Sequence, residues 1–188
     1  MRQAVNISLC GKLRSGKDSV ADYLVENYGY IRYAFGDGLR EVCQRLYPDQ
    51  FESGNKPRAL LQSFGEYART HDPNVWVNDM FRRITNDEHA RYSPIVVSDV
   101  RQPQEVEALK AAGYVLIRVE APESLRIHRA IESGDTFNLR DLTHDTETAL
   151  DGYAADFTIQ NDAGLPELYA QVDAVMDLLR SSSGGEAA

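Results

Sequence analysis

Residues 11–17 read G-K-L-R-S-G-K and match the pattern G-x-x-x-x-G-K. An apolar run rich in β-branched residues precedes them at 4–10 and predicts a buried strand, while residues 18–28 carry apolar side chains at helical spacing and stop at Gly29. Between a strand and a helix, the glycines allow a tight turn whose backbone N–H groups surround a phosphate, together with the helix N-terminus and the final lysine. The pattern therefore predicts a nucleotide-binding phosphate loop at 11–17; the alternative is an incidental glycine-rich turn.

Strands and helices alternate along the rest of the chain. The hydrophobic pattern predicts strands at 4–10, 30–35, 94–98, 114–120 and 157–160, and helices at 18–28, 36–47, 56–71, 74–84, 106–112, 122–133 and 165–179. The expected fold class is therefore α/β in three layers, with a mostly parallel five-stranded sheet and helices on both faces. We expect one domain over residues 1–180 and a disordered, low-complexity tail at 181–188.

The charge balance restricts the partners of such a chain. There are 20 Lys and Arg residues against 29 Asp and Glu residues, a formal charge of −9. This balance argues against nucleic acid as the main partner, and anionic ligands must be captured by locally placed cations. The two cysteines, Cys10 and Cys43, lack metal-site spacing and are too few for a disulfide scaffold. With no signal peptide and no membrane-spanning run, we expect a cytoplasmic protein with no membrane partner.

A second polar cluster follows the strand predicted at 94–98. Asp99 and Arg101 are expected just past its end, with Glu105 one helical turn further. A carboxylate there can orient a phosphate acceptor, hold a metal-bound water or fix an arginine, and Arg101 offers a planar fork to phosphate. Ligands of such sheets bind at the carboxyl ends of the strands, so we predict that this cluster shares a site with the phosphate loop. The alternative is a surface salt bridge.

The residue after Lys17 departs from the general pattern. A Ser or Thr whose hydroxyl ligates Mg²⁺ usually stands there, whereas this chain has Asp18 followed by Ser19. A carboxylate is a good ligand for a hard cation, directly or through water, so Asp18 serves the metal on one interpretation. On the other, Asp18 caps the helix and Ser19 meets the ion. The sequence leaves both open.

Four further arginines and the single tryptophan are candidate ligands. Arg40 and Arg58 lie near the starts of two predicted helices, and Arg126 and Arg129 are three residues apart on another. Phosphoryl transfer needs several cations, because charge spreads over the oxygens of the transferred group. Taken singly, each arginine reads as a solvated surface residue. Trp76, on an apolar helical stripe, either packs in the core or stacks on a base.

The sequence resembles the phage-type deoxynucleoside monophosphate kinases, a family of P-loop kinases. The resemblance covers most of residues 5–180 and rests on 14–19, 61–65, Trp76, 98–102 with Glu105, 143–152 and 159–165. That family also has Asp after the loop lysine. Animal-type phosphomevalonate kinases share the Ser-Gly-Lys-Asp and Ser-Asp-x-Arg blocks, and dephospho-CoA kinases are similar in the last strand and helix.

The resemblance implies roles for the residues that match. ATP-binding positions are matched by Arg14, Gly16, Asp18 and Ser19, which join Gly11, Ser15 and Lys17 of the loop motif. Deoxynucleotide-binding positions are matched by Arg40, Arg58, Trp76, Asp99, Arg101 and Glu105, with Arg40 standing where the family has a lysine. By analogy, Arg126 and Arg129 would be lid arginines at the ATP. The resemblance further implies a P-loop kinase fold with an insertion for the nucleoside monophosphate at about 36–90 and a short lid at about 122–146.

These features predict a kinase that uses ATP and Mg²⁺ to convert a deoxynucleoside monophosphate, a small-molecule partner, to the diphosphate. Lys17 would neutralise the donor phosphates, Asp99 and Arg101 would orient and hold the acceptor phosphate, and Asp18 or Ser19 would meet the metal. The alternatives are a kinase of phosphomevalonate or dephospho-CoA, or a non-catalytic nucleotide-binding regulatory module. The net charge disfavours a nucleic-acid end kinase. The sequence is also compatible with a homodimer.

Overall fold

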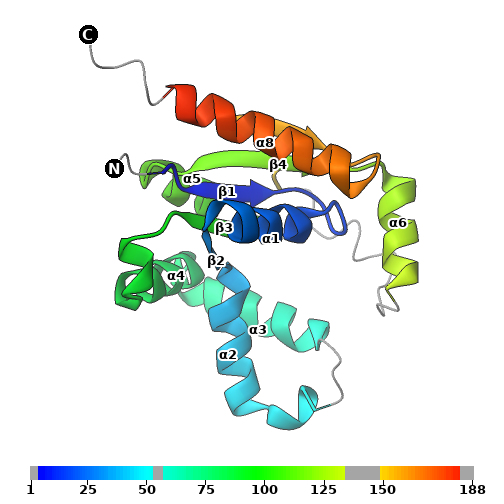
Figure 1. Cartoon of the computed structure of the whole chain (residues 1–188). Helices are drawn as coiled ribbons and strands as arrows, with labels where there is room; N and C mark the ends of the chain where they lie inside the picture. The colour runs from blue at the N-terminus through cyan, green and yellow to red at the C-terminus, as the bar shows by residue number, and fades with distance from the viewer. Residues whose placement is uncertain (1–3, 53–56, 134–148, 183–188) are drawn as a thin grey trace. The chain divides into compact units, whose positions relative to one another are not determined.

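The computed structural model describes residues 4–52, 57–133 and 149–182 (Figure 1). The chain divides into two compact units. Unit 1 combines the residues up to Arg32 with those from Ser93 onward, and unit 2 is Tyr33–Tyr92. Of the expected lid, residues 134–146 lie outside the described residues, as do residues 183–188 of the expected tail.

A single sheet organises unit 1, in the strand order β2-β3-β1-β4-β5. The strands are β1 (Ile7–Cys10), β2 (Ile31–Tyr33), β3 (Ile95–Val100), β4 (Val115–Glu120) and β5 (Phe157–Gln160). β1 pairs in parallel with β3 and β4, and β4 pairs in parallel with β5. The predicted α/β class, with a mostly parallel five-stranded sheet, is confirmed.

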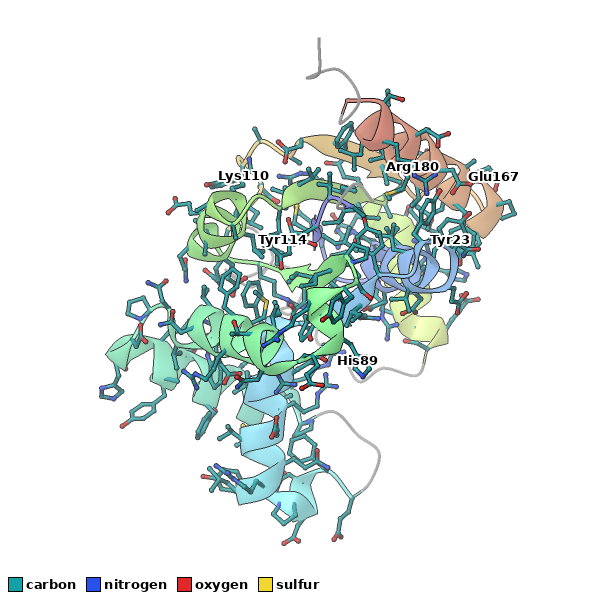
Figure 2. All side chains as sticks on the ribbon, turned by 60° about the vertical axis from the view of Figure 1, so that its left-hand side comes forward. Tyr23, His89, Lys110, Tyr114, Glu167 and Arg180 are labelled. Carbon is teal, nitrogen blue, oxygen red and sulfur yellow. The ribbon has the colours of Figure 1, made fainter. Side chains whose placement is uncertain are left out.

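Helices cover both faces of the sheet. In the described residues of unit 1 the helices are α1 (Lys17–Tyr28), α5 (Pro103–Ala111), α6 (Glu123–Glu132) and α8 (Leu165–Ser182). Figure 2 shows Tyr23 of α1 and Arg180 of α8 on one side of the sheet and Lys110 of α5 on the other. Since α1 follows β1 and α5 follows β3, the chain changes face between these adjacent strands, and ligands of such sheets bind at the carboxyl ends of strands beside such a change.

Alternate strand residues build the core between the sheet and the α1/α8 layer. The buried residues of this core are Ile7, Leu9, Val20, Ala21, Leu24, Tyr30, Val96, Ile117, Val119, Ile159, Leu168, Val172, Val175 and Met176. At its rim the Tyr28 hydroxyl donates to the Asp173 carboxylate at 2.6 Å, and the Tyr23 ring stacks on Tyr169 with centroids 4.1 Å apart. These contacts join α1 to α8 and so fix the helix that starts at the phosphate loop.

Within the described residues of unit 2 there are three helices and two short 3₁₀ turns. They are α2 (Phe35–Leu46), α3 (Arg58–His71), α4 (Val75–Asn86), and the turns Pro48–Gln50 and His89–Arg91. α2 packs against both α3 and α4. Trp76 of α4 is buried and its indole N–H donates to the Gly65 carbonyl of α3 at 3.2 Å. Core packing, one of the two predicted roles of Trp76, is therefore observed.

Several predicted boundaries were wrong, and three of them have a clear structural cause. β3 runs through Val100, because Cys10 of β1 pairs with Val100 after a register shift, so Asp99 lies within the strand and not past its end. α2 begins at Phe35, since the extended backbone ends at Ala34. α5 begins at Pro103, because Gln102 and Glu105 form a capping box around its first turn.

No helix in the described ranges has the length and apolar character needed to cross a membrane.

Candidate functional site

The phosphate loop joins β1 to α1 at the carboxyl edge of the sheet. Gly11 and Gly16 have φ of 142° and 103°, values that residues with a Cβ atom rarely adopt. Space forbids a side chain as well: a Cβ on Gly11 would overlap the Val119 carbonyl, and one on Gly16 would overlap the Asn161 amide. Arg14, between them, also has a positive φ of 62°. The backbone of β4 and the residue after β5 thus leave room only for glycine at these two positions and restrict the path of the loop.

Two buried polar groups of the loop suit a bound phosphate. Lys17 is buried, and its Nζ donates to the carbonyls of Gly11 at 2.5 Å and Lys12 at 3.0 Å. Ser15 is also buried, and among the described residues its hydroxyl has no hydrogen-bond partner. A buried hydroxyl without a partner is costly, so it indicates a ligand that supplies one. The loop therefore fits a polyphosphate.

Asp18 forms an ion pair that the sequence did not indicate. Its carboxylate accepts a hydrogen bond from Nη2 of Arg32, while Nη1 of Arg32 donates to Asp22 at 2.8 Å and Nε donates to the buried Ser98 hydroxyl at 2.9 Å. The Asp18 side chain is 80% exposed, which leaves it accessible to a cation. The only signal for Arg32 was a single cation in a short predicted strand.

Asp18 and Ser19 are an adequate donor set for Mg²⁺. No group of three or more His, Cys, Asp or Glu side chains in the described part of the chain is arranged to hold a metal. Mg²⁺ does not need one, because it commonly binds one or two protein oxygens and completes its shell with phosphate oxygens and water. The carboxylate and hydroxyl at the start of α1 match that chemistry.

The end of β3 meets the phosphate loop in unit 1. A small cavity of about 20 Å³ lies where the loop, the end of β3 and the residue after it, β4 and the segment after residue 148 come together. It is lined by Gly11, Lys12, Val100, Arg101, Arg118, Leu150 and Asp151. The structure thus brings Arg101 beside the loop, as the sequence predicted. Three cations and one carboxylate line this space, which favours an anionic group.

Glu105 is buried at the start of α5. Its side chain is 3% exposed, and Oε2 accepts the backbone N–H groups of Arg101 at 2.8 Å and Gln102 at 3.0 Å. Glu105 therefore fixes the turn that carries Arg101. The family resemblance implies that Glu105 holds the deoxynucleotide, and in this structure two of its contacts are to the backbone of the turn.

Arg118 is a site residue that the sequence analysis missed. Its Nη2 donates to the carbonyls of Leu150, at 2.9 Å, and Tyr153, and in the same segment Asp151 pairs with Lys12 at 3.0 Å. Both contacts tie residues 150–153 to the edge of the sheet. The available signal was a lone arginine flanked by apolar residues in the strand V-L-I-R-V-E.

The thiol of Cys10 lies at the end of β1, next to the loop. Burial raises the pKa of Cys10, and the charges of Arg118 and Lys17 lower it by less. The thiol therefore stays neutral and unreactive at neutral pH, as expected for a small buried residue.

The remaining predicted residues fall in two places. Arg126 of α6 is buried and donates to the Leu13 carbonyl at 3.3 Å, and Arg129 donates to the Arg14 carbonyl at 3.4 Å. Both arginines thus contact the loop backbone within unit 1. Arg40 in α2, Arg58 at the first position of α3 and Trp76 in α4 belong to unit 2.

Sequence comparison gives a family match. Residues 57–172 match the family model described as "Deoxynucleotide monophosphate kinase". The chain is 27% identical over 206 residues to a "Putative deoxynucleotide monophosphate kinase" of Acanthamoeba polyphaga mimivirus, with 92% of this chain and 96% of that protein aligned. It is also 28% identical to the "Uncharacterized protein ORF77" of Ictalurid herpesvirus 1 (strain Auburn), over 86% of this chain and 66% of that protein.

Solved structures agree in fold. A gluconokinase from Sinorhizobium meliloti 1021 is similar with a TM-score of 0.63 at 16% identity, over 100% of both chains. A shikimate kinase from Acinetobacter baumannii in complex with shikimate is similar with a TM-score of 0.61 at 17% identity, over 95% of this chain and 94% of that one. The predicted P-loop kinase fold is confirmed.

Proposed function

Because the chain belongs to the deoxynucleotide monophosphate kinase family, we propose that it transfers the γ-phosphoryl group of ATP to a deoxynucleoside monophosphate, giving the diphosphate, with Mg²⁺. The observation that carries this proposal is the cavity shared by Gly11 and Lys12 of the loop and Arg101 after β3. A donor loop and an acceptor cation at one edge are what transfer between two phosphates requires. The matched residues 57–172 exclude the loop, so motif and family match support the proposal independently.

The protein's part in this reaction is to bind, align and neutralise. Lys17 would exchange its carbonyl contacts for the β- and γ-phosphates. Arg101 would hold the acceptor phosphate in line, with its backbone fixed by Glu105, and Asp99 would orient that phosphate or the sugar. When bound, Mg²⁺ would supply charge neutralisation on the phosphate oxygens; Asp18 or Ser19 would hold it.

Unit 2 is proposed to bind the acceptor. Arg40 and Arg58 would add positive charge for its phosphate, which an acidic chain must place locally. Trp76 would contribute to the binding of the base indirectly. Its indole N–H bond to the Gly65 carbonyl holds α4 against α3 and so positions the residues of these two helices. Arg14, Gly16 and Arg126 would serve the ATP side.

The test is a turnover panel. The protein is incubated with ATP, Mg²⁺ and, separately, each deoxynucleoside monophosphate, phosphomevalonate and dephospho-CoA, and ADP formation is followed. Diphosphate formation from a deoxynucleotide supports the proposal. Turnover of phosphomevalonate or dephospho-CoA alone would reassign the acceptor, and nucleotide binding without turnover of any acceptor would indicate a regulatory module.

In the active protein, Lys17→Ala is expected to lower kcat by about 10³-fold, because it removes a donor-site cation.

A further inference from the structure

Three side chains from outside the phosphate loop hold the carbonyl groups of three consecutive loop residues. Arg126 donates to Leu13 at 3.3 Å, Arg129 to Arg14 at 3.4 Å, and Asn161 to Ser15 at 2.8 Å. We call Arg126, Arg129 and Asn161 the carbonyl clamp. Two members come from α6 and one directly follows β5; Figure 1 shows α6 beside the loop that leads into α1.

The neighbouring carbonyls of the loop also have donors. Lys17 Nζ donates to those of Gly11 and Lys12, and the Val20 N–H donates to that of Gly16 at 3.1 Å. Every carbonyl from Gly11 to Gly16 therefore accepts a hydrogen bond in this structure. Those from Lys12 to Gly16 keep a donor after Lys17 moves to the phosphates, since the Ser15 N–H also donates to the Lys12 carbonyl at 3.1 Å. An unpaired carbonyl oxygen facing a phosphate would repel it, so this arrangement suits a loop that receives an anion through its N–H groups.

Asn161 is the central member of the clamp. It is 4% exposed, its Nδ2 donates to the Ser15 carbonyl, and its Oδ1 accepts from Nη2 of Arg129 at 3.0 Å. Because Nδ2 can only donate and Oδ1 can only accept, one orientation of the amide satisfies both neighbours. Its backbone N–H also donates to the Glu120 carbonyl at 2.6 Å, which anchors the residue to the end of β4.

Holding these carbonyls also sets the direction of the loop's N–H groups. A trans peptide unit is planar, so its C=O and N–H point to opposite sides. Fixing the carbonyls of residues 13–15 therefore directs the N–H groups of residues 14–16 away from the clamp. The Ser15 N–H donates to the Lys12 carbonyl at 3.1 Å and closes a turn. Donors fixed before a ligand arrives need not be ordered when it binds, which strengthens binding.

We propose that Asn161, held by Arg129, is a positioning residue that preorganises the phosphate loop for the polyphosphate of the donor. This inference rests on the proposed function, which supplies the nucleotide. It gives Arg129 a role through the loop backbone, distinct from the direct contact with ATP that the family resemblance implies for a lid arginine.

The experiment compares Asn161→Asp, Asn161→Ala and Arg129→Lys with the wild type. Asn161→Asp keeps the size of the side chain and an acceptor for Arg129 but removes the donor to Ser15. Gln160→Ala is the matched control, since its exposed side chain in β5 donates to Glu120, and its bonds to Gln171 are made by the backbone and so survive the substitution. Calorimetry measures binding of inorganic tripolyphosphate and of ATP, thermal denaturation measures stability, and kinetics give KM for ATP and for the acceptor.

We expect both Asn161 variants to lose about tenfold in affinity for tripolyphosphate and ATP, the equivalent of one hydrogen bond of about 1.4 kcal/mol. KM for ATP should rise while KM for the acceptor stays constant, and Arg129→Lys should show a smaller loss, since it retains the charge. If folded Asn161→Ala and Arg129→Lys bind tripolyphosphate and ATP as tightly as the wild type, this inference is overturned and the proposed function still stands. A wild type that binds neither tripolyphosphate nor ATP would overturn the proposed function and, with it, this inference.

Discussion

Arg32 shows how one side chain can control the charge at a site. Its guanidinium contacts Asp18 and Asp22, one helical turn apart on α1, while its Nε is anchored on Ser98. Two carboxylates at this spacing repel each other, and the arginine between them relieves that repulsion. A cation that binds Asp18 must compete with this arginine.

Removing the arginine should therefore favour the metal. We expect Arg32→Gln to lower the Mg²⁺ concentration for half-maximal activity about threefold, because a partly exposed ion pair is worth about 1 kcal/mol or less. Titration of activity with Mg²⁺ at saturating ATP measures this. Arg32→Gln in an Asp18→Asn background should cause no further shift; an equal shift there would show that Asp18 is not the group concerned.

At the residue scale, the sequence indicated residues that belong to a motif or stand at the end of a predicted strand. It missed the residues that hold these in place through contacts from other parts of the chain. Lys17 could be named because a one-dimensional pattern places it, and Arg101 because parallel strands end at one edge. Arg32, Arg118 and Asn161 could not be named. Their contacts depend on which strand lies beside which and in what register, and local periodicity carries no such information.

The start of α5 depends on a single buried carboxylate, Glu105, which accepts two backbone N–H groups. We expect Glu105→Ala to lower the free energy of unfolding by about 1–2 kcal/mol, because it removes the acceptor of the Arg101 and Gln102 N–H groups, which immediately precede the helix. Thermal or urea denaturation measures the change. Glu107→Ala, at an exposed position of the same helix, should change stability by well under half as much; equal effects would argue against the capping role.

The end of β2 is joined to the residue after α4 by a hydrogen bond from the Tyr33 hydroxyl to the Asp87 carboxylate, within unit 2. This bond, followed by the backbone N–H of His89, lowers the pKa of Asp87 below its ordinary value of 3.8. A carboxyl with a lowered pKa in the folded state contributes stability above its unfolded pKa and loses it as the pH falls through the folded value.

Tyr33→Phe should therefore reduce the loss of stability in acid. The variant is expected to be less stable than the wild type at neutral pH, with the difference shrinking below about pH 4 as Asp87 protonates in both proteins. Denaturant unfolding at several pH values checks this. A difference that stays constant down to the acid range would show that the bond does not couple to the charge of Asp87.

At the element scale, order and type were predictable while several ends were not. The strand at 94–98 was identified from three consecutive β-branched residues, yet β3 continues to Val100 because pairing with Cys10 extends the ladder. The helix expected from 36 starts at Phe35, a buried residue that follows the extended Ala34. Tertiary contacts decide such ends.

The whole chain has a formal charge of −9 although it is proposed to bind two anions. Its cations at the site are therefore a local exception on an acidic molecule. We expect no saturable binding of short single- or double-stranded DNA at physiological salt in a gel mobility assay, while nucleotides bind. A complex that weakens steeply with added salt would reveal a basic surface that the composition does not suggest.

For the molecule as a whole, the strand order was not predictable in detail, but the fold class was. Alternating apolar runs and amphipathic stripes imply a parallel sheet between helices, and the loop motif fixes which strand is central to the site. The division at Tyr33–Tyr92 was not predictable from local patterns, because it is defined by contacts between residues that are far apart in the sequence.

The sole tryptophan gives unit 2 an optical reporter of its own. Trp76 is buried with its N–H bonded to Gly65, so its emission spectrum will shift when the packing of α3 and α4 is lost and will be blind to melting confined to the sheet. Far-ultraviolet dichroism, by contrast, sums the helices of both units. Following the two signals in one urea series will therefore distinguish a single cooperative transition from stepwise unfolding of the two units.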